Sequence, residues 1–578
     1  MNVFRASSDE TISWIQTSAQ LLVAIPLVSY LLAVLSLWIG FSVNGFIFPA
    51  AVCLSVLWVC TEKNMQRRVK WSSVLTVVGV LLVTILISMY VYDWSYDGQW
   101  YHICTVRELV NGWNPLWDTS VSSSVDRDTA MWVEHYPRGI ETIVATVVAF
   151  LGNLDAGKVL NMWLVIASMG YVYIFLHDFL PNRTRYMRLW ITVLITLNPV
   201  VIVQLFTCYI DWTLYTLLVI FLVNLYLFFE KGERRALYVD LLLLFFISSI
   251  KFNIFFWIVL WGGILFFILL RNHKYKQPCR LTVICAVIAL AGIVIGGYNP
   301  YVTNWQEHGS PFYPLAGDEK VDIFNNQVLP MMQGKSNFEN VLLSLVANPS
   351  NNMNSDEVSV VGISKNNLSA SWVSDARIGG FGIFFFESVL LALILFISTG
   401  YSRRMAWYLV ALVGLLASLF ILPYGYWARY VSFFYLFPFV LLFYAERYGL
   451  KRRLSRGVHI LVLTLLSIDV FISLSGVIVQ NVVYRQTVDY VLNRMEASTQ
   501  EVELSTCNYL FLDKMERRGI PYKLVPEETL KDRLDISNPI YLNREDFDFE
   551  TNQPGILSIY SSFGLRCEPN EHYTGNAK

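Results

Sequence analysis

The chain has 578 residues, of which 55% are hydrophobic and only 15% are charged, and its net charge is -1. Soluble globular domains usually carry about 25% charged residues, so the composition excludes an ordinary soluble protein and predicts an α-helical polytopic membrane protein. The balanced charge, with no basic stripe outside short loops between apolar segments, gives no reason to expect nucleic acid as a partner.

Long apolar segments recur along most of the chain, and a helix needs about 20 apolar residues to cross the hydrocarbon core of a bilayer. The polar N-terminus leads directly into a full-length segment, which predicts an uncleaved first span rather than a signal peptide. About 13 transmembrane helices are predicted, at 18–40, 45–61, 71–91, 156–178, 188–207, 210–229, 236–250, 253–271, 281–299, 381–399, 405–423, 430–447 and 458–480.

Lysine and arginine residues cluster in short loops, and such loops are typically cytoplasmic. With thirteen spans and a cytoplasmic N-terminus, all of these clusters fall on the cytoplasmic side. The loops concerned are 62–70, 179–188, 230–235, 271–280, 400–404 and 447–456. The segments 92–155, 300–380 and 481–578 then lie on the outer face. The apolar segment 139–151 is too short to cross, so we expect a helix at the outer interface.

Three regions follow from this topology. Residues 1–70 form two N-terminal transmembrane helices and a cytoplasmic loop, 71–480 form the main transmembrane domain, and 481–578 form a small extracytoplasmic α/β domain. Helical patterns in this tail cover 488–495 and 528–534, and strand-like patterns cover 508–512, 540–542 and 556–560. Cys507 and Cys567 lie in the same tail, and whether they pair is left open.

The outer loop that follows the third span is dense in charge, which marks a functional-site hypothesis at a membrane surface. Asp93 and Asp97 precede Tyr101 and His102 there. On a helix, Asp97 and Tyr101 would share one face. A carboxylate in this position can act as a general base, but either aspartate would equally serve as a helix cap. Both interpretations remain open.

Four further charged residues are predicted at the same face. Asp211 is either a helix cap or a second carboxylate that orients an acceptor or holds Mg²⁺ or Mn²⁺. Lys251 either extends to the interface or binds a lipid phosphate. Arg377 and Arg429 offer forked guanidinium groups suited to phosphate, with a carboxylate from the first outer loop as the alternative partner of Arg429. Together they indicate group transfer from a lipid-phosphate donor. The phosphate would be the leaving group, and Lys and Arg would stabilise its charge.

The motifs within 75–480 resemble the polytopic membrane glycosyltransferases of the GT-C fold. The resemblance rests on Asp97-Gly-Gln-Trp-Tyr-His102, GWNP at 112–115, HYP at 135–137, SIKF around Lys251, HGSPFYPL at 308–315, RIGGFG at 377–382 and Arg429-Tyr430. It implies an enzyme of a bacterial cytoplasmic (inner) membrane. That enzyme would transfer a sugar, with inversion, from a polyprenyl-phosphate donor to a glycan, lipid or protein acceptor of the cell envelope.

The resemblance also implies roles for individual residues. Asp97 would be the catalytic base, helped by Asp93 or Asp211. The other roles are acceptor contacts for Asp211, His102 and Tyr101, donor phosphate contacts for Lys251, Arg429 and Arg377, and sugar contacts for Trp100, Trp113 and Tyr136. A transporter or flippase of lipid-linked saccharides, or a polymerase or ligase of the same substrates, is the alternative function.

Overall fold

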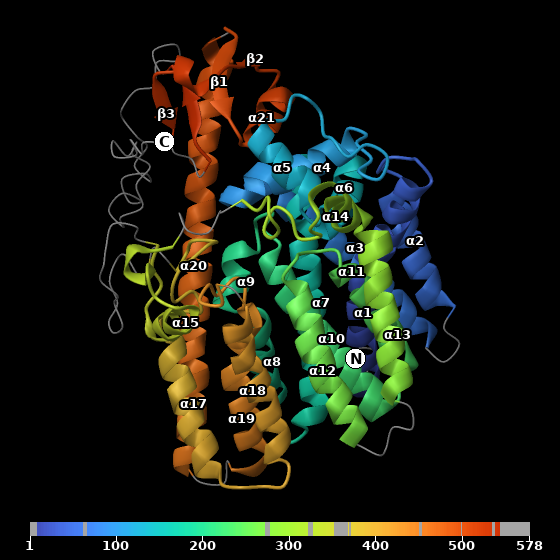
Figure 1. Ribbon diagram of the computed structural model, residues 1–578. Coiled ribbons are helices and arrows are strands. Elements are labelled where there is room, and N and C mark those ends of the chain that lie inside the picture. The colour runs from blue at the N-terminus through green and yellow to red at the C-terminus, as the bar shows by residue number, and fades with distance from the viewer. Residues whose placement is uncertain are drawn as a thin grey trace, which may run out of the picture.

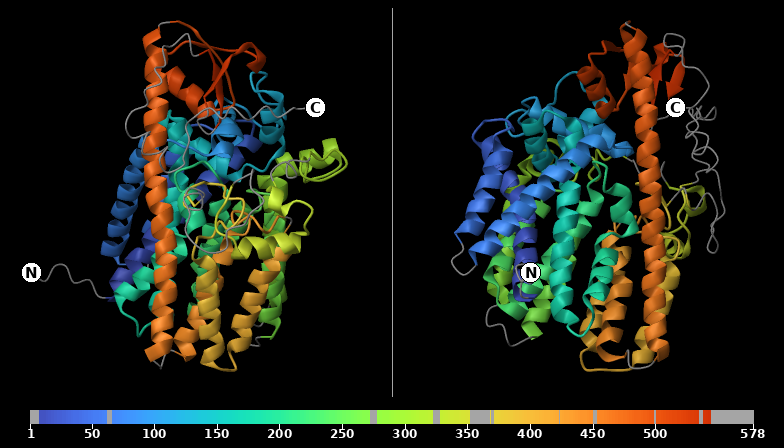
Figure 2. Two further views of the ribbon diagram at one scale, coloured as in Figure 1. Left: turned by 90° about the vertical axis from the view of Figure 1, so that its left-hand side faces the viewer. Right: turned by 180° about the vertical axis from the view of Figure 1, so that it is seen from behind.

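The computed structural model describes residues 8–543 apart from 62–65, 272–277, 322–327, 352–367, 369–370, 423, 450–452, 499 and 535–537. Helices stand side by side through most of the molecule, and a small sheet lies at one end (Figures 1 and 2). The α-helices are α1 Ser8–Trp38, α2 Ile47–Cys60, α3 Arg67–Tyr90, α4 Ile103–Val110, α5 Arg127–His135, α6 Gly139–Leu151, α7 Val159–Phe179, α8 Arg185–Thr196, α9 Pro199–Gln204, α10 Asp211–Lys231, α11 Arg234–Ile247, α12 Ile254–Arg271, α13 Pro278–Ala291, α14 Thr303–His308, α15 Asn337–Val346, α17 Phe385–Thr399, α18 Met405–Ile421, α19 Phe437–Tyr448, α20 Arg453–Ser498 and α21 Tyr509–Arg518. Shorter helical turns are η1 Gly98–His102, η2 Leu154–Lys158, η3 Gly292–Gly296, η4 Tyr298–Val302, η6 Pro330–Met332, η7 Ser432–Leu436 and η8 Glu527–Thr529.

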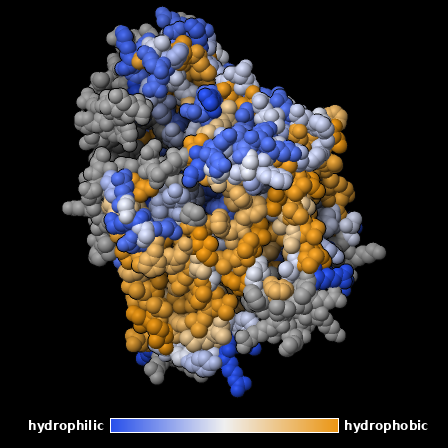
Figure 3. All heavy atoms as spheres, viewed as in Figure 1, coloured by the Kyte–Doolittle hydropathy of each residue, from blue (hydrophilic) through white to orange (hydrophobic). Residues whose placement is uncertain are grey.

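Within the described residues, five helices are long and apolar enough to cross a membrane: Glu10–Trp38, Arg67–Tyr90, Leu154–Phe179, Asp211–Lys231 and Arg453–Ser498. A sixth span results if Arg280–Gly296 and Tyr298–His308, bent by 87°, count as one. Apolar side chains cover the lower part of the face in Figure 3, and polar side chains cover its upper end. The chain is therefore a membrane protein, although these helices do not establish the count of thirteen spans.

Several predicted spans are interrupted. The predicted span 188–207 consists of α8 and α9, because Asn198 caps α9 and Pro199 occupies its first turn. Proline lacks the amide hydrogen that a continuous helix would need at that point. The predicted helix 139–151 is present as α6 with those bounds, but nearly all of its side chains are buried against α1, α2 and α4. Protein rather than lipid therefore surrounds most of α6.

The C-terminal domain differs most from its prediction. The predicted helix at 488–495 is the end of the 46-residue helix α20, which runs without a break from the last predicted span into this domain. The segment 508–512, predicted as a strand, opens α21, where Asn508 caps the helix. The segment 528–534, predicted as a helix, contains the end of η8 and the strand β3. The strand at 540–542 is confirmed as β4, and 556–560 and Cys567 lie outside the described residues.

The sheet of this domain has the order β2-β1-β4-β3. Its strands are β1 Val502–Thr506, β2 Tyr522–Leu524, β3 Asp532–Leu534 and β4 Ile540–Leu542. The helix α21 connects β1 to the parallel strand β2, whereas β4 pairs antiparallel with both β1 and β3. The domain contacts the first outer loop on both sides of Asp97. Asn538 donates to the Tyr96 carbonyl at 2.8 Å, and Asn508 donates to the Gln99 side chain at 2.5 Å.

Three of the six basic loops meet at one end of the helices. Arg183 pairs with Glu446 at 2.7 Å, and Lys231 pairs with Asp178 at 2.5 Å. These contacts bring together the loops after α7, α10 and α19. Helix α10 runs from Asp211 to Lys231, and a helix of that length spans about 30 Å. The basic loops and the charged groups predicted at the outer face therefore lie at opposite ends of α10.

Candidate functional site

A polar cavity of about 560 Å³ lies between the first outer loop and the loop that precedes α17. Its lining residues are Trp94, Tyr96, Asp97, Trp100, Tyr101, Trp132, Tyr136, Tyr209, Lys251, Leu315, Asn351, Val373, Ser374, Asp375, Arg377, Arg429, Tyr430 and Gln480. They come from segments more than 380 residues apart. The fold thus gathers aromatic, acidic and basic side chains around one space.

Arg429 is the electrostatic centre of this cavity. Its guanidinium lies 3.2 Å from the Asp97 carboxylate, 3.7 Å from Asp211 and 3.1 Å from Asp375. The Arg429 side chain is only 8% exposed, and Asp211 is 2% exposed, whereas Asp97 is 22% exposed. The predicted alternative partner of Arg429, a carboxylate from the first outer loop, is therefore confirmed. Of the three carboxylates around Arg429, Asp97 is the one that solvent or a substrate reaches most easily.

Lys251 completes the cluster. Its ammonium pairs with the Asp211 carboxylate and lies 4.5 Å from the centre of the Tyr430 ring. Arg429 lies 4.9 Å from the centre of the same ring. A buried lysine held between a carboxylate and an aromatic face does not extend to the interface, so the pairing excludes snorkelling as the explanation for Lys251. Lys251 and Arg429 thus form one cluster of charges with the three carboxylates.

The local backbone explains how Asp97 enters the cavity. Asp97 precedes η1, but its side chain accepts no capping hydrogen bond. The capping interpretation of Asp97 is therefore wrong in this structure. Gly98 packs so tightly that a Cβ atom there would lie 2.1 Å from the Ser95 hydroxyl and 2.7 Å from the Asp93 carboxylate. Any larger residue at position 98 would therefore displace Ser95 or Asp93, next to the Asp97 carboxylate that pairs with Arg429.

The remaining acids and cations also sit where helices break. Asp211 is the first residue of α10, and Ile210 rather than Asp211 occupies the capping position. Lys251 lies in the short break between α11 and α12. Arg429 lies in the connection between α18 and α19. Helix ends leave backbone groups open to polar partners, so these positions suit a polar site at the edge of an apolar bundle.

Four predicted site residues do not line the polar cavity. Asp211 is one of them, although it pairs with Lys251 and Arg429, and the other three lie apart from that cluster. The buried Asp93 carboxylate accepts hydrogen bonds from the Ser95 amide at 2.7 Å and the Cys208 amide at 2.6 Å. His102 is buried with its Nδ1 atom 2.5 Å from Glu141 on α6. Trp113 donates to the Asp118 carbonyl at 2.9 Å. Asp93, His102 and Trp113 thus bond to other parts of the protein rather than line the polar cavity.

The sequence prediction missed Asp375. Asp375 lies two residues before Arg377, a predicted site residue. That position was the only feature of the sequence that could have indicated Asp375 as a site residue. Burial raises the pKa of Asp375, and the charge of Arg429 opposes that rise. Tyr209 was missed as well, and its ring centre lies 5.4 Å from the Arg429 guanidinium.

A second cavity, of about 490 Å³, adjoins the polar one. It is lined mainly by apolar side chains of α10, α12, α13 and α18, including Leu218, Phe221, Trp257 and Trp261. Arg429 and Tyr430 line both cavities. An apolar space thus ends at the charged cluster, an arrangement suited to an amphiphile with a charged head.

The predicted Mg²⁺ or Mn²⁺ ion has no clear place here, because the guanidinium of Arg429 occupies the position between Asp97, Asp211 and Asp375 that a divalent cation would need. No family model, curated protein or solved structure matches this chain.

Proposed function

We propose that the chain is a membrane glycosyltransferase of the GT-C type. It transfers a sugar from a polyprenyl-phosphate donor to an acceptor of the cell envelope at the outer face of a bacterial inner membrane. The observation that carries this proposal is the junction of an apolar cavity with a polar one at Arg429 and Tyr430. A lipid-linked sugar has the same order of parts: an apolar chain, then a phosphate, then a polar ring.

The donor lies along this junction. Its prenyl chain occupies the space beside Phe221, Trp257 and Trp261. Its phosphate lies against Lys251 and Arg429, where a guanidinium offers paired donors. The sugar enters the polar cavity, where aromatic side chains present faces and edges to the ring. These side chains are Trp100, Tyr101, Trp132 and Tyr136.

Asp97 is the general base in this arrangement. It accepts the proton of an acceptor hydroxyl while the acceptor oxygen attacks the anomeric carbon from the face opposite the phosphate. The bond between that carbon and the phosphate oxygen breaks, and the polyprenyl phosphate leaves with its charge stabilised by Lys251 and Arg429. A single displacement of this kind inverts the anomeric centre.

Donor binding would also change the partner of Asp97. Without a donor, Asp97 is one of three carboxylates that neutralise Arg429. A donor phosphate competes for the same guanidinium, and Asp97 is the most exposed of the acids and thus the cheapest to release into the cavity. The carboxylate becomes a free base only when the donor is in place.

The predicted topology belongs to the same proposal. Three of the six loops rich in lysine and arginine gather at the end of the bundle away from the cavities, as cytoplasmic loops would. Thirteen crossings would require the shorter apolar helices, such as α2, α17 and α18, to cross with support from their neighbours. The C-terminal domain would then stand outside the membrane.

The test is donor consumption by the purified chain in lipid nanodiscs. We would supply a panel of polyprenyl-phosphate sugars with extracts of envelope acceptors and follow release of free polyprenyl phosphate. Release that requires both sugar-bearing donor and acceptor supports a transferase. Movement of an intact lipid-linked saccharide between leaflets, without cleavage, would instead identify a flippase, and joining of saccharides that already carry several sugars would identify a polymerase or ligase.

A further inference from the structure

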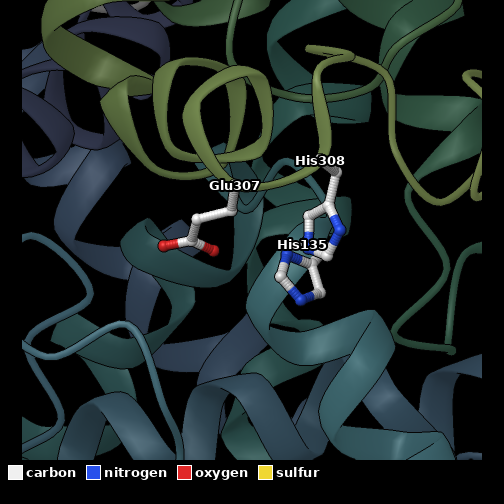
Figure 4. A group of neighbouring side chains, drawn as sticks. All are labelled: His135, Glu307 and His308. Carbon is white, nitrogen blue, oxygen red and sulfur yellow. The ribbon is translucent and has the colours of Figure 1, made fainter.

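Two Glu–His dipeptides, 134–135 and 307–308, meet away from the charged cluster. His135 ends α5, and Glu307 and His308 end α14. Ligand atoms of His135, Glu307 and His308 all lie within 4.8 Å of one another. Figure 4 shows the three side chains gathered where α5 and α14 approach. Segments about 170 residues apart therefore present two imidazoles and a carboxylate to one point.

The tautomer of His135 follows from its surroundings. The buried Asn304 amide donates from its nitrogen to the His135 carbonyl at 3.0 Å and the Tyr313 carbonyl at 2.8 Å. Its oxygen therefore faces the ring and lies 2.8 Å from Nδ1 of His135. Because an amide oxygen only accepts, Nδ1 carries the proton. The Nε2 atom of His135 is left with its lone pair.

His308 is arranged in the same way. Its Nδ1 atom lies 2.6 Å from the Glu319 carboxylate, which also only accepts when ionised. The ring stacks on Tyr313, with centres 3.7 Å apart and planes 12° from parallel. Its Nε2 lone pair is thereby fixed in direction. In metal sites, ligating imidazoles characteristically donate their other nitrogen to a carboxylate or carbonyl, and both rings meet that condition.

We propose that His135, Glu307 and His308 bind a divalent transition-metal ion of the zinc type, which ties α5 to α14. Two imidazole nitrogens and one carboxylate oxygen are a zinc donor set, whereas Mg²⁺ and Ca²⁺ prefer oxygen ligands alone. Tetrahedral bonds of about 2.0–2.1 Å place ligand atoms about 3.3 Å apart. The three ligand atoms, now within 4.8 Å of one another, would close to that spacing when the ion binds, and the Glu307 side chain is exposed.

The fourth position would be taken by a water molecule or by Glu134. The Glu134 carboxylate lies 3.9 Å from Nε2 of His135, and its other oxygen accepts from the Val121 amide at 2.7 Å. It lies outside the group of three residues whose ligand atoms are all within 4.8 Å of one another, so it would have to move to complete the coordination sphere. A site closed by four protein ligands is typical of a structural ion rather than a catalytic one.

The ion would fix two walls of the polar cavity. Tyr136, which follows His135 directly, lines that cavity, as does Leu315, which lies two residues beyond the Tyr313 ring that stacks on His308. Binding of the ion is a property of this cluster alone and does not depend on the proposed transfer reaction. The site thus positions the cavity walls without contacting a substrate.

The experiment is zinc binding by the full-length chain, purified with a tag that lacks histidine and stripped with a chelator. Zinc is titrated in the presence of a colorimetric competitor, and bound metal is measured by elemental analysis. We expect about one tightly bound zinc per chain. His135→Gln and His308→Gln should each weaken binding at least about tenfold, and Glu307→Gln should weaken it as well. His177→Gln, at the other end of the bundle on α7, is the matched control and should bind like the wild type.

Zinc should also raise the thermal unfolding midpoint of the wild type and of His177→Gln, because a ligand that binds the folded chain stabilises it. Glu307 is exposed, so Glu307→Gln tests the site even if a histidine variant fails to fold. The proposal is overturned if the wild type holds no tightly bound zinc. It is equally overturned if Glu307→Gln and His308→Gln bind zinc with wild-type affinity.

Discussion

The Nη1 atom of Arg429 lies 3.2 Å from the Oδ2 atom of Asp97, across a sequence separation of 332 residues. The proposed base and the proposed phosphate ligand are therefore bonded to each other before any substrate arrives. This contact connects the first outer loop to the connection between α18 and α19. Substitutions of the two residues should have different effects. Loss of the Asp97 carboxylate should remove activity, whereas loss of the Arg429 guanidinium should remove activity and also destabilise the protein.

Asp97→Asn should abolish sugar transfer while the protein remains folded. Amide in place of carboxylate removes the base, and loss of a general base typically costs about 10²–10⁴ in rate. Asp375 and Asp211 still neutralise Arg429, so the unfolding midpoint should change little. Donor turnover and thermal unfolding of the same preparation check both expectations. Transfer at the wild-type rate would remove Asp97 from the mechanism.

Asp93→Asn should behave in the opposite way. The new amide nitrogen would face the Cys208 amide hydrogen that now bonds to the carboxylate, and a buried unsatisfied donor costs about 1–3 kcal/mol. Burial raises the pKa of Asp93, while Lys158 and the donors of Ser95 and Cys208 oppose the rise. The folded chain therefore holds this proton more tightly than the unfolded chain does.

For such a group, stability is fully present below the ordinary aspartate pKa and declines as pH rises through the raised value. Asn cannot ionise, so the deficit of Asp93→Asn in unfolding midpoint should shrink as the pH rises above about 4, the ordinary pKa of aspartate. Thermal unfolding of both proteins across this range measures the difference. A deficit that grows with pH would contradict the assigned direction.

Arg429→Ala should destabilise the protein strongly, and Asp375→Asn should restore part of the loss. Removing the guanidinium leaves buried carboxylates facing one another, and breaking a buried pair costs about 3–5 kcal/mol. Neutralising Asp375 removes one of the repelling charges. The four proteins of this double-mutant cycle should show a coupling of about 0.5–3 kcal/mol. Additive effects would mean that Asp375 and Arg429 do not interact in solution.

Residues that line the cavity were predicted from the sequence more accurately than the helix boundaries were. Asp97, Lys251, Arg377 and Arg429 were identifiable because a charge at the end of an apolar segment is costly and therefore informative. The same reasoning was misleading for Asp93. Its carboxylate is stabilised by hydrogen bonds from Ser95 and Cys208, and the contact with Cys208 becomes visible only in the fold.

Helix boundaries failed for a related reason. Asn198 and Pro199 mark the break between α8 and α9 within the sequence, but the apolar residues on both sides of them favoured a single span, so the two helices were predicted as one. In the tail, the apolar segment 508–512 was predicted as a strand, but the Asn508 cap and burial on both sides make it the start of α21. In both cases a local capping signal was present, and the apolar residues beside it outweighed it in the prediction.

Gly263→Leu should obstruct the apolar cavity selectively. Gly263 lines that cavity, and no atom lies within 4 Å of the Cβ that a side chain would add. A leucine would fill the space of the prenyl chain, so KM for a long-chain donor should rise several-fold, while a short-chain water-soluble donor should be used as before. The matched control is Gly79→Leu on α3, which also adds its side chain to open space. In both variants the helix gains intrinsic propensity of about 1 kcal/mol, so a loss of folding would not explain the result.

Lys514→Ala should loosen the C-terminal domain from the rest of the protein. Lys514 on α21 lies 2.7 Å from Asp155 in η2, and the two side chains are 6% and 1% exposed. Lys158 still pairs with Asp155 at 3.0 Å, so the cost should be about 1–3 kcal/mol rather than the full penalty of an unpaired buried charge. Limited proteolysis after α20 should then become faster.

Lys523→Ala is the control for that change within the same domain. Its pair with Glu503, at 3.2 Å, is about half exposed on both sides, and such pairs contribute about 0–1 kcal/mol. Because the domain touches Tyr96 and Gln99 on either side of Asp97, Lys514→Ala should also lower the rate of transfer, whereas Lys523→Ala should not. Equal proteolysis of the two variants would show that the Asp155 contact does not hold the domain in place.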